Sequence, residues 1–166
     1  MICPACGFEN IQGVDQCDNC GADLRTADIP APSTRFEADL VSRSLATLQP
    51  PPHVTIGVSA SAGDAVRLMH EHGIGCVVVE DGGGVRGILS ERDLVLKLSD
   101  GRLEGVTVGQ LMTQDPVVLR PDDSVAVAIH KMAVGGFRHI PLVENGHSTG
   151  LVAAQDVFRH ILRTLD

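Results

Sequence analysis

Four of the five cysteines in this 166-residue chain lie within the first 20 positions, with a spacing that suits a metal ion. Cys3 and Cys6 form one CxxC pair, and Cys17 and Cys20 form a second pair ten residues later. A CxxC turn directs two sulfurs toward one point, and zinc prefers four such ligands in a tetrahedron. The spacing therefore predicts a four-thiolate site with zinc as the expected ion.

A glycine follows each pair, at Gly7 and Gly21, where a tight turn favours a residue without a Cβ atom. Cys-Pro-Ala-Cys-Gly followed by Cys-Asp-Asn-Cys-Gly resembles a short zinc ribbon over residues 1–24. Two other interpretations of these cysteines are disulfide bonds in a secreted domain and a rubredoxin-like iron site. No basic segment followed by an apolar one indicates an export signal, so zinc is the leading interpretation.

Residues 1–24 carry four acidic side chains and no lysine or arginine. Because neutralisation of phosphates supplies most non-specific nucleic-acid affinity, this segment is poorly suited to DNA or RNA. So short a segment buries little apolar surface, and the metal must supply most of its folding free energy. We therefore expect the ribbon to be a protein-contact module or a spacer.

The other reactive residue types do not form the pattern of a catalytic site. Cys76 lies in an apolar run that predicts a buried strand, so we expect a small core side chain. His70 and His72 lack the i, i+4 spacing of a zinc-binding helix, and Gly82–Gly84 is not followed by the lysine of a phosphate loop. Without a nucleophile elbow or a conspicuous carboxylate pair, we do not expect an enzyme.

The composition predicts a folded chain with an aliphatic core. Hydrophobic residues make up 43% of the chain, with four phenylalanines and no tryptophan or tyrosine. The net charge of −8 and the scarcity of aromatic rings both argue against a nucleic-acid surface. No apolar run approaches the roughly 20 residues of a membrane span. We therefore expect a cytoplasmic protein without a membrane partner.

Residues 25–34 carry two prolines and little that could pack, so we interpret them as a linker with few contacts to either side. Thr34 and Glu37 then form a capping-box pattern at the start of a helix. Apolar residues continue at helical spacing through Leu48, until three prolines at 50–52 end the helix. We assign residues 25–44 to the linker and lead-in helix.

The rest of the chain repeats itself without a gap at an offset of 63 residues, as from Asp93 to Asp156. Other matching pairs are Val54 and Val117, Ser61 and Ser124, Ala65 and Ala128, Met69 and Met132, Gly73 and Gly136, and Gly87 and Gly150. A single register indicates a duplication. We place the first repeat at residues 45–105 and the second at residues 106–166.

Each repeat has the same predicted order of elements, β-α-β-β-α. Strands are expected at residues 54–56, 76–79 and 85–89, and again at residues 117–119, 140–143 and 151–152. Helices are expected at residues 64–72 and 91–98, and again at residues 124–133 and 155–165. Glycines close the first helix of each repeat, and Gly-rich or Asn-Gly turns join the hairpins.

The first repeat contains Gly87-Ile88-Leu89-Ser90-Glu91-Arg92-Asp93, and the second contains Phe137-Arg138-His139-Ile140-Pro141 with Asp156. On these residues both repeats resemble CBS repeats, a family named after cystathionine β-synthase. A tandem pair is called a Bateman module, and the resemblance covers residues 45–166. It implies a mixed α/β (α+β) fold of two packed CBS repeats behind the small zinc ribbon.

Bateman modules of this type commonly bind adenosine-containing ligands between their repeats and regulate another protein. The binding signature of the family ends in a hydroxyl residue and an aspartate, here Ser90 and Asp93. The carboxylate can accept hydrogen bonds from two ribose hydroxyls, and the hydroxyl at a helix start favours a phosphate. The same Ser-x-x-Asp spacing is also an ordinary helix-capping pattern that needs no ligand.

The resemblance implies that the other repeat completes each cleft. For the Asp93 cleft these residues are Thr113, Phe137 and Arg138. Arg138 can pair with a phosphate, and Phe137 can pack on adenine. The alternative for Arg138 is a solvated arginine at the start of a strand.

The second repeat departs from the binding pattern. Asp156 is present, but Ala153 replaces the hydroxyl residue. The residues that would complete its cleft, Ile74 and Gly75, carry no charge. We therefore expect one competent cleft at Asp93 and a weak or empty one at Asp156.

These expectations combine into a regulatory sensor for AMP, ADP, ATP or S-adenosylmethionine that acts on a protein not named by the sequence. The alternatives are a ligand-free structural adaptor and a nucleic-acid-binding ribbon protein, which the acidic charge opposes. We also expect a homodimer that pairs through helices. The apolar residues considered for that contact are Ala65, Leu68, Met69, Ala128, Ile129 and Met132.

Overall fold

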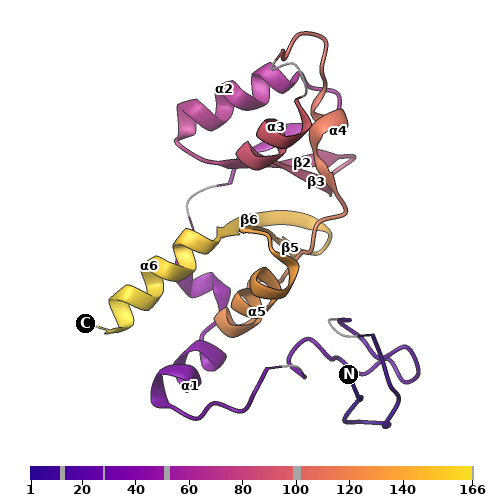
Figure 1. The fold of residues 1–166 in the computed structure, drawn as a ribbon, viewed down its shortest axis with the longest axis vertical. Coiled ribbons are helices and arrows are strands. Elements are labelled where there is room, and N and C mark those ends of the chain that lie inside the picture. The colour runs from indigo at the N-terminus through magenta and orange to yellow at the C-terminus, as the bar shows by residue number, and fades with distance from the viewer. Residues whose placement is uncertain (12–13, 28, 51–52, 99–101, 166) are drawn as a thin grey trace.

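The computed structural model describes residues 1–11, 14–27, 29–50, 53–98 and 102–165 (Figure 1). Figure 1 shows two βα units, one above the other, with the N-terminal segment beside α5 of the second unit. Pro51 and Pro52, two of the prolines expected to end the lead-in helix, lie outside the described residues. Within the described part, no helix is both long enough and apolar enough to cross a membrane.

The first repeat has the predicted order of elements. They are β1 (Thr55–Gly57), α2 (Ala62–His72), β2 (Cys76–Asp81), β3 (Gly84–Ser90) and α3 (Glu91–Lys97). β1 pairs with β2 in parallel, and β2 pairs with β3 in an antiparallel hairpin. A short strand from the second repeat's lead-in segment, β4 (Thr113–Gln114), completes this four-stranded sheet at the edge of β3.

The second repeat follows the same order except for its first strand. Its elements are α5 (Val125–Gly135), β5 (His139–Glu144), β6 (His147–Ala153) and α6 (Ala154–Leu165). β5 and β6 form a two-stranded antiparallel sheet. The predicted mixed α/β fold of two repeats is therefore confirmed.

Local signals explain where the helices and hairpins begin and end. The hydroxyl of Ser61 accepts a hydrogen bond from the backbone of Asp64 and caps α2, as a serine N-cap does. Gly73 ends α2 in the left-handed conformation at φ 61°, where a Cβ atom would be unfavourable. Asn145 and Gly146 both have positive φ, as a tight hairpin between β5 and β6 requires.

The prediction of a strand at residues 117–119 is wrong, because within this segment only Leu119 forms a bridge, with Leu142. In the first repeat, the backbone N–H of Val78 donates to the carbonyl of Val54 and extends the parallel pairing. The equivalent residue in the second repeat is Pro141, which has no N–H to donate. The parallel ladder is therefore reduced to a bridge.

The lead-in helix also differs from its prediction. α1 (Arg35–Ser42) has the predicted capping box of Thr34 and Glu37, but it ends at Ser42 rather than near the prolines. A separate 3-10 turn, η1 (Leu45–Leu48), follows. The backbone N–H of Leu45 donates to the carbonyl of Asp123, so this segment pairs with the second repeat instead of continuing the helix.

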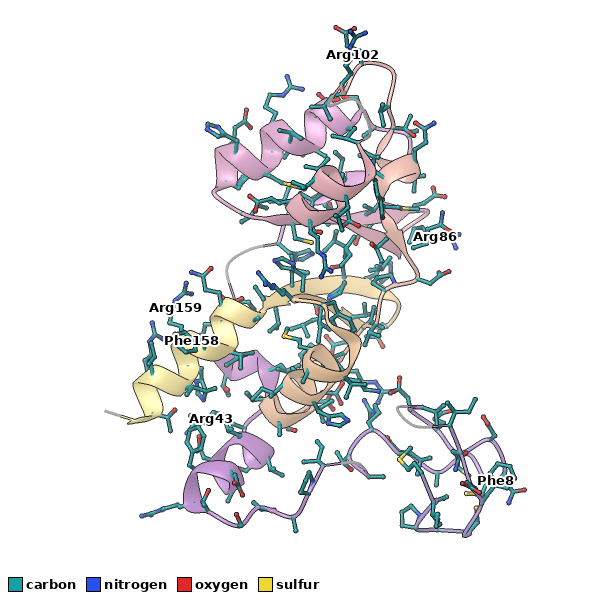
Figure 2. The ribbon with its side chains drawn as sticks, viewed as in Figure 1. Phe8, Arg43, Arg86, Arg102, Phe158 and Arg159 are labelled. Carbon is teal, nitrogen blue, oxygen red and sulfur yellow. The ribbon has the colours of Figure 1, made fainter. Side chains whose placement is uncertain are left out.

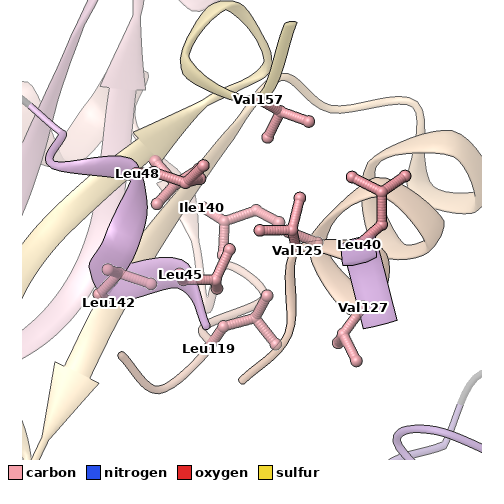
Figure 3. Close-up of a cluster of buried hydrophobic side chains, with 11 residues drawn as sticks. Leu40, Leu45, Leu48, Leu119, Val125, Val127, Ile140, Leu142 and Val157 are labelled. Atoms are coloured by element: carbon pink, nitrogen blue, oxygen red, sulfur yellow. The ribbon is translucent and has the colours of Figure 1, made fainter. Parts of the chain in front are cut away.

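The lead-in segments of the two repeats are exchanged in the folded chain. Leu45 and Leu48 are buried with Leu119 and Ile140 in the core of the second repeat (Figure 3). The equivalent turn 63 residues later, α4 (Val108–Leu111), is buried in the core of the first repeat. Each sheet is therefore covered partly by a segment from the start of the other repeat, which joins the two units.

The apolar helix residues considered for dimer contacts lie largely inside the repeats. Ala65, Met69 and Ala128 are buried in the two cores, and Ile129 and Met132 pack against the second core. These five side chains therefore cover the chain's own sheets, as some of the six were expected to do, while Leu68 is half-buried outside both cores, and a homodimer paired through helices stays a prediction. Large apolar side chains are also exposed at Val95 and Leu96 on α3, Val134 on α5, and Phe158 and Leu162 on α6.

The N-terminal segment contains two small hairpins, marked by bridges between Ile2 and Glu9 and between Gln16 and Asp23. Its small core of Cys3, Cys17 and Leu24 is separate from the cores of the two repeats. Two ion pairs join this segment and the linker to the second repeat, as described below.

Candidate functional site

The four N-terminal cysteines converge, with their sulfur atoms all within 4.8 Å of one another. The Sγ atoms of Cys3 and Cys20 are 3.7 Å apart, and those of Cys6 and Cys17 are 3.6 Å apart. A tetrahedral zinc with Zn–S bonds of about 2.3 Å has sulfurs separated by about 3.8 Å. The distances fit four ligands around one ion, and they are too long for the disulfide alternative.

Asn10 links the two cysteine pairs, and sequence analysis missed it. Its buried amide donates to Sγ of Cys17 at 3.5 Å and to the carbonyl of Phe8, while its carbonyl oxygen accepts from the backbone of Asp18. An amide that donates to a thiolate stabilises its charge and orients it toward a metal. The position of Asn10 between the two cysteine pairs is the sequence signal that could have indicated this role.

The carboxylate of Asp93 lies at the start of α3, where it accepts from both polar groups of Ser90. The backbone N–H of Ser90 donates to Oδ2 at 2.9 Å, and the Ser90 hydroxyl donates to the same oxygen at 2.5 Å. The backbone N–H of Asp93 donates back to the Ser90 hydroxyl, which completes a capping box. The capping interpretation of this pair is therefore confirmed; by itself it neither requires nor excludes a ligand.

The second oxygen of Asp93 receives two further donors. The hydroxyl of Thr113 donates to Oδ1 at 2.7 Å, and Nζ of Lys97 forms an ion pair with it at 2.8 Å. Lys97 also donates to the carbonyls of Leu111 and Met112, and these hydrogen bonds join α3 to the end of α4. Sequence analysis missed Lys97, although its i, i+4 spacing from Asp93 was visible.

The environment of Asp93 favours the charged carboxylate. Burial opposes ionisation, but the hydrogen bonds from Lys97, Ser90 and Thr113 outweigh it and hold the pKa of Asp93 below its usual range. Asp93 is therefore a carboxylate at neutral pH and can accept hydrogen bonds from hydroxyl groups.

All five residues predicted for the ligand line one cavity of about 750 Å³ between the repeats: Ser90, Asp93, Thr113, Phe137 and Arg138. The first two come from the first repeat, and the other three come from the second repeat and its lead-in segment. Arg92 crosses the cavity and donates to the carbonyl of Gly136 at 3.2 Å. The cavity thus has a carboxylate on one wall, with an aromatic ring and a guanidinium on the other.

The cavity that Asp156 lines is about 240 Å³, and it adjoins a larger cavity of about 860 Å³ with which it shares Ile74, Gly75 and Ala153. The backbone N–H of Ala153 donates to Asp156, but Ala153 has no hydroxyl to add. Nη1 of Arg159 lies 3.3 Å from Oδ1 of Asp156. The expectation that this cleft has no basic partner is therefore wrong, because Arg159 lies one helical turn along α6 (Figure 2).

His139 lies where the two clefts meet, because it lines both cavities. Burial lowers its pKa and outweighs the attraction of nearby Asp156 and Glu91, so the neutral imidazole is favoured. Cys76 is the equivalent residue of the first repeat. Burial raises the pKa of Cys76 to about 12, which confirms a core side chain rather than a reactive thiol.

Two βα units in one register, with exchanged lead-in segments and clefts between them, match a known family. The CBS domain model matches residues 41–100 and residues 108–163. The chain belongs to the CBS domain family. The two matches form a tandem CBS pair, as the sequence resemblance predicted.

Relatives of this CBS protein share the repeats but differ in length. An uncharacterized 17.7 kDa protein of Acidianus ambivalens is 35% identical over 113 residues, which cover 67% of this chain and 65% of that protein. CBS-domain containing protein ATU1752 from Agrobacterium tumefaciens is 33% identical with a TM-score of 0.65, over 70% of this chain and 98% of that one. The chain spans less than two thirds of the length of several curated relatives.

A solved CBS structure with a bound ligand shares the fold. CBSX2 in complex with AMP has a TM-score of 0.62 at 23% identity, over 75% of this chain and 99% of that chain. At this identity the likeness concerns the fold alone.

Proposed function

We propose that this protein is a regulatory sensor that binds an adenosine-containing ligand in the cleft of Asp93. The observation that carries the proposal is the convergence of an ionised carboxylate, Phe137 and Arg138 on one cavity between the repeats. These are the groups that a ribose, an adenine and a phosphate each require. CBSX2 shares the fold and binds AMP, which makes AMP the first ligand to test.

The ligand would place its ribose against Asp93 and its phosphate near Arg138. Both oxygens of Asp93 already accept donors, so ribose hydroxyls would have to share or replace the contacts from Thr113 and Lys97. Arg138 is a bidentate donor suited to a phosphate, and Phe137 offers a ring face for the base. ADP, ATP and S-adenosylmethionine stay alternatives within the same cleft.

One strong site per chain follows from the unequal clefts. The Asp93 cavity of about 750 Å³ has the usual size of a ligand site, about 300–1,000 Å³. The cavity that Asp156 itself lines is about 240 Å³, but it adjoins one of about 860 Å³ with which it shares Ile74, Gly75 and Ala153, so the distinction rests on the polar groups rather than on size. Each aspartate has a basic partner, but Ser90 and Thr113 add hydroxyl groups beside Asp93, whereas Ala153 supplies none beside Asp156. The Asp156 cleft is therefore the weak or empty one.

The ribbon is proposed to hold one structural zinc through Cys3, Cys6, Cys17 and Cys20. The four sulfurs have the separations that a tetrahedral ion needs, and zinc would supply the folding free energy that so small a hairpin pair lacks. Iron, which accepts the same ligands, is the alternative.

The protein is further proposed to act as a cytoplasmic homodimer without an enzymatic activity of its own. Reduced thiolates suit a cytoplasmic metal site. Phe158, labelled in Figure 2, is 60% exposed on α6, and Leu162, one helical turn later, is 49% exposed. A second copy of the chain would cover both side chains. The regulated protein would then respond to whether the dimer has ligand bound.

A thermal-shift and calorimetric series with AMP, ADP, ATP, S-adenosylmethionine and adenosine tests the proposal. A ligand that prefers the folded state raises its stability. In Arg138→Ala, we expect ligands with phosphate groups to lose more affinity than adenosine does. No stabilisation by any of the five would favour the ligand-free structural adaptor.

A further inference from the structure

The ribbon and its linker contact the second repeat through two ion pairs between residues far apart in the sequence. Oδ1 of Asp15 lies 2.6 Å from Nζ of Lys131, and Nη1 of Arg25 lies 2.6 Å from Oδ1 of Asp123. Three of the four side chains are largely covered, with exposures of 20% for Arg25, 9% for Asp123 and 12% for Lys131. Burial strengthens such pairs relative to exposed ones.

Both contacts depend on the hairpin that carries the second cysteine pair. The backbone N–H of Leu24 donates to the carbonyl of Asp15, and Gln16 bridges to Asp23, so Asp15 and Arg25 emerge from the two ends of one hairpin. Asp23 also holds the Arg25 guanidinium through Nε and Nη2. Cys17 and Cys20 lie inside this hairpin, so an ion bound there would fix the spacing of the two contacts.

In the second repeat, one ion pair lies just before α5 and the other lies within it. Asp123 immediately precedes Ser124, the N-cap of α5, and the Asp123 carboxylate also accepts from the backbone of Arg120. Lys131 lies in the second half of α5, one turn before Gly135. The ribbon thus holds α5 at its start and again near its end.

The end of α5 forms part of the ligand cleft. Gly135 and Gly136 line the Asp93 cavity and are followed at once by Phe137 and Arg138, which line it too. The carbonyl of Gly136 accepts the hydrogen bond from Arg92 that crosses this cavity. A displacement of α5 would therefore move the wall that faces Asp93.

We propose that the metal state of the ribbon controls ligand affinity in the Asp93 cleft through α5. With the ion bound, the hairpin holds α5 in place and keeps Phe137 and Arg138 preorganised. Without the ion, the hairpin loosens, both ion pairs weaken, and the cleft loses affinity. The coupling rests on the proposed function, and linkage makes it reciprocal, so the ligand must also strengthen metal binding.

The coupling should be modest, because Asp15 is 55% exposed and surface pairs are weak. We expect removal of the metal to lower AMP affinity about fivefold, at the lower end of allosteric couplings. The test uses the full chain, loaded with zinc or treated with a chelator, and measures AMP binding by calorimetry. Hydrogen exchange over residues 124–138 is measured in parallel without nucleotide.

Charge reversal separates this contact from other effects of the metal. In Lys131→Glu, exchange over residues 124–138 should be faster than in the wild type with zinc bound, and chelation should change AMP affinity less, because only the Arg25–Asp123 contact remains. Adding Asp15→Lys should restore the pair with opposite polarity and the response to chelation. Glu9→Gln removes another carboxylate of the ribbon and should behave like the wild type.

The possible outcomes test the coupling and the proposed function separately. Unchanged exchange over residues 124–138 on chelation overturns the coupling, as does equal AMP affinity with and without metal. Absence of AMP binding in both states overturns the proposed function. In that case the exchange measurement still tests whether the metal restrains α5.

Discussion

Asp93 and Asp156 occupy equivalent positions 63 residues apart, but their carboxylates have different partners. Asp93 accepts from Ser90, Thr113 and Lys97, whereas Asp156 accepts from the backbone of Ala153 and pairs with Arg159. Both aspartates cap a helix, so capping does not distinguish them. The difference lies in the hydroxyl donors, because Ser90 and Thr113 donate to Asp93, whereas Ala153 stands in the place of Ser90 beside Asp156.

Gly87 is predicted to be intolerant of a side chain, and Gly150 is its matched control. A Cβ atom at Gly87 would lie 2.7 Å from Sδ of Met112 and 2.8 Å from the carbonyl oxygen of Thr113, which belongs to β4. At Gly150 it would meet only the flexible side chain of Leu142, at 3.3 Å. We expect Gly87→Ala to cost about 1–3 kcal/mol of stability, measured by denaturant unfolding, and Gly150→Ala to cost less. Equal losses would contradict the close approach of β4 to β3.

The stability of the fold should depend on the ionisation of Asp93. Burial is outweighed by hydrogen bonds from Lys97, Ser90 and Thr113, so the pKa of Asp93 is lower when folded than its unfolded value of about 3.9. Its contribution is then present above the unfolded pKa and disappears as pH falls through the folded pKa. We expect thermal unfolding to separate wild type and Asp93→Asn most near neutral pH, with the difference shrinking below about pH 4. A constant difference across this range would refute the stabilising role of the carboxylate.

Protein purified without chelators should carry one zinc per chain. Cys6→Ser removes one thiolate and should lower the metal content sharply, whereas Cys76→Ala, a change in the core, should leave it intact. Elemental analysis measures both. Chelation should unfold residues 1–24 while the CBS repeats stay folded, because their cores contain no ribbon residue among those described. Protein without zinc or iron would contradict the metal site.

The exposed side of α6 should mediate self-association. Phe158→Lys places a charge where a second copy would bury an aromatic ring, so we expect the homodimer to dissociate into chains of 17.5 kDa. Ile11→Lys changes an apolar residue of the ribbon that is 77% exposed, against 60% for Phe158, and should leave the dimer intact. Light scattering over the micromolar range measures both, and a wild-type protein already at the mass of one chain would contradict the dimer.

The elements with local signals could be predicted from the sequence. Ser61 and Gly73 delimit α2, and Asn145-Gly146 makes the turn of the second hairpin, because each signal acts within a few residues. The end of α1 could not be predicted in this way. The apolar spacing through Leu48 also fits a longer helix. The helix stops before Leu45 because the backbone N–H of Leu45 donates to the carbonyl of Asp123, which is distant in the sequence.

The candidate site was predicted as far as the family resemblance reaches. Ser90, Asp93 and Arg138 were found because they match a motif, and the structure brings them to one cavity. Lys97 and Arg159 belong to no such motif, although their spacing from the two aspartates was visible. The ion pairs between the ribbon and α5 join residues about a hundred positions apart, and no local pattern indicates them.

Calorimetry with AMP on the wild type and two matched variants tests the central claim most directly. Asp93→Asn should lose hydrogen bonds to a charged acceptor, each worth about 1.5–3 kcal/mol, which lowers affinity at least tenfold. Asp156→Asn makes the same change at the equivalent helix start and should leave AMP affinity nearly unchanged. One strong binding event per chain, lost only in Asp93→Asn, is the predicted result. Equal losses in the two variants would mean two equivalent sites and would contradict the account.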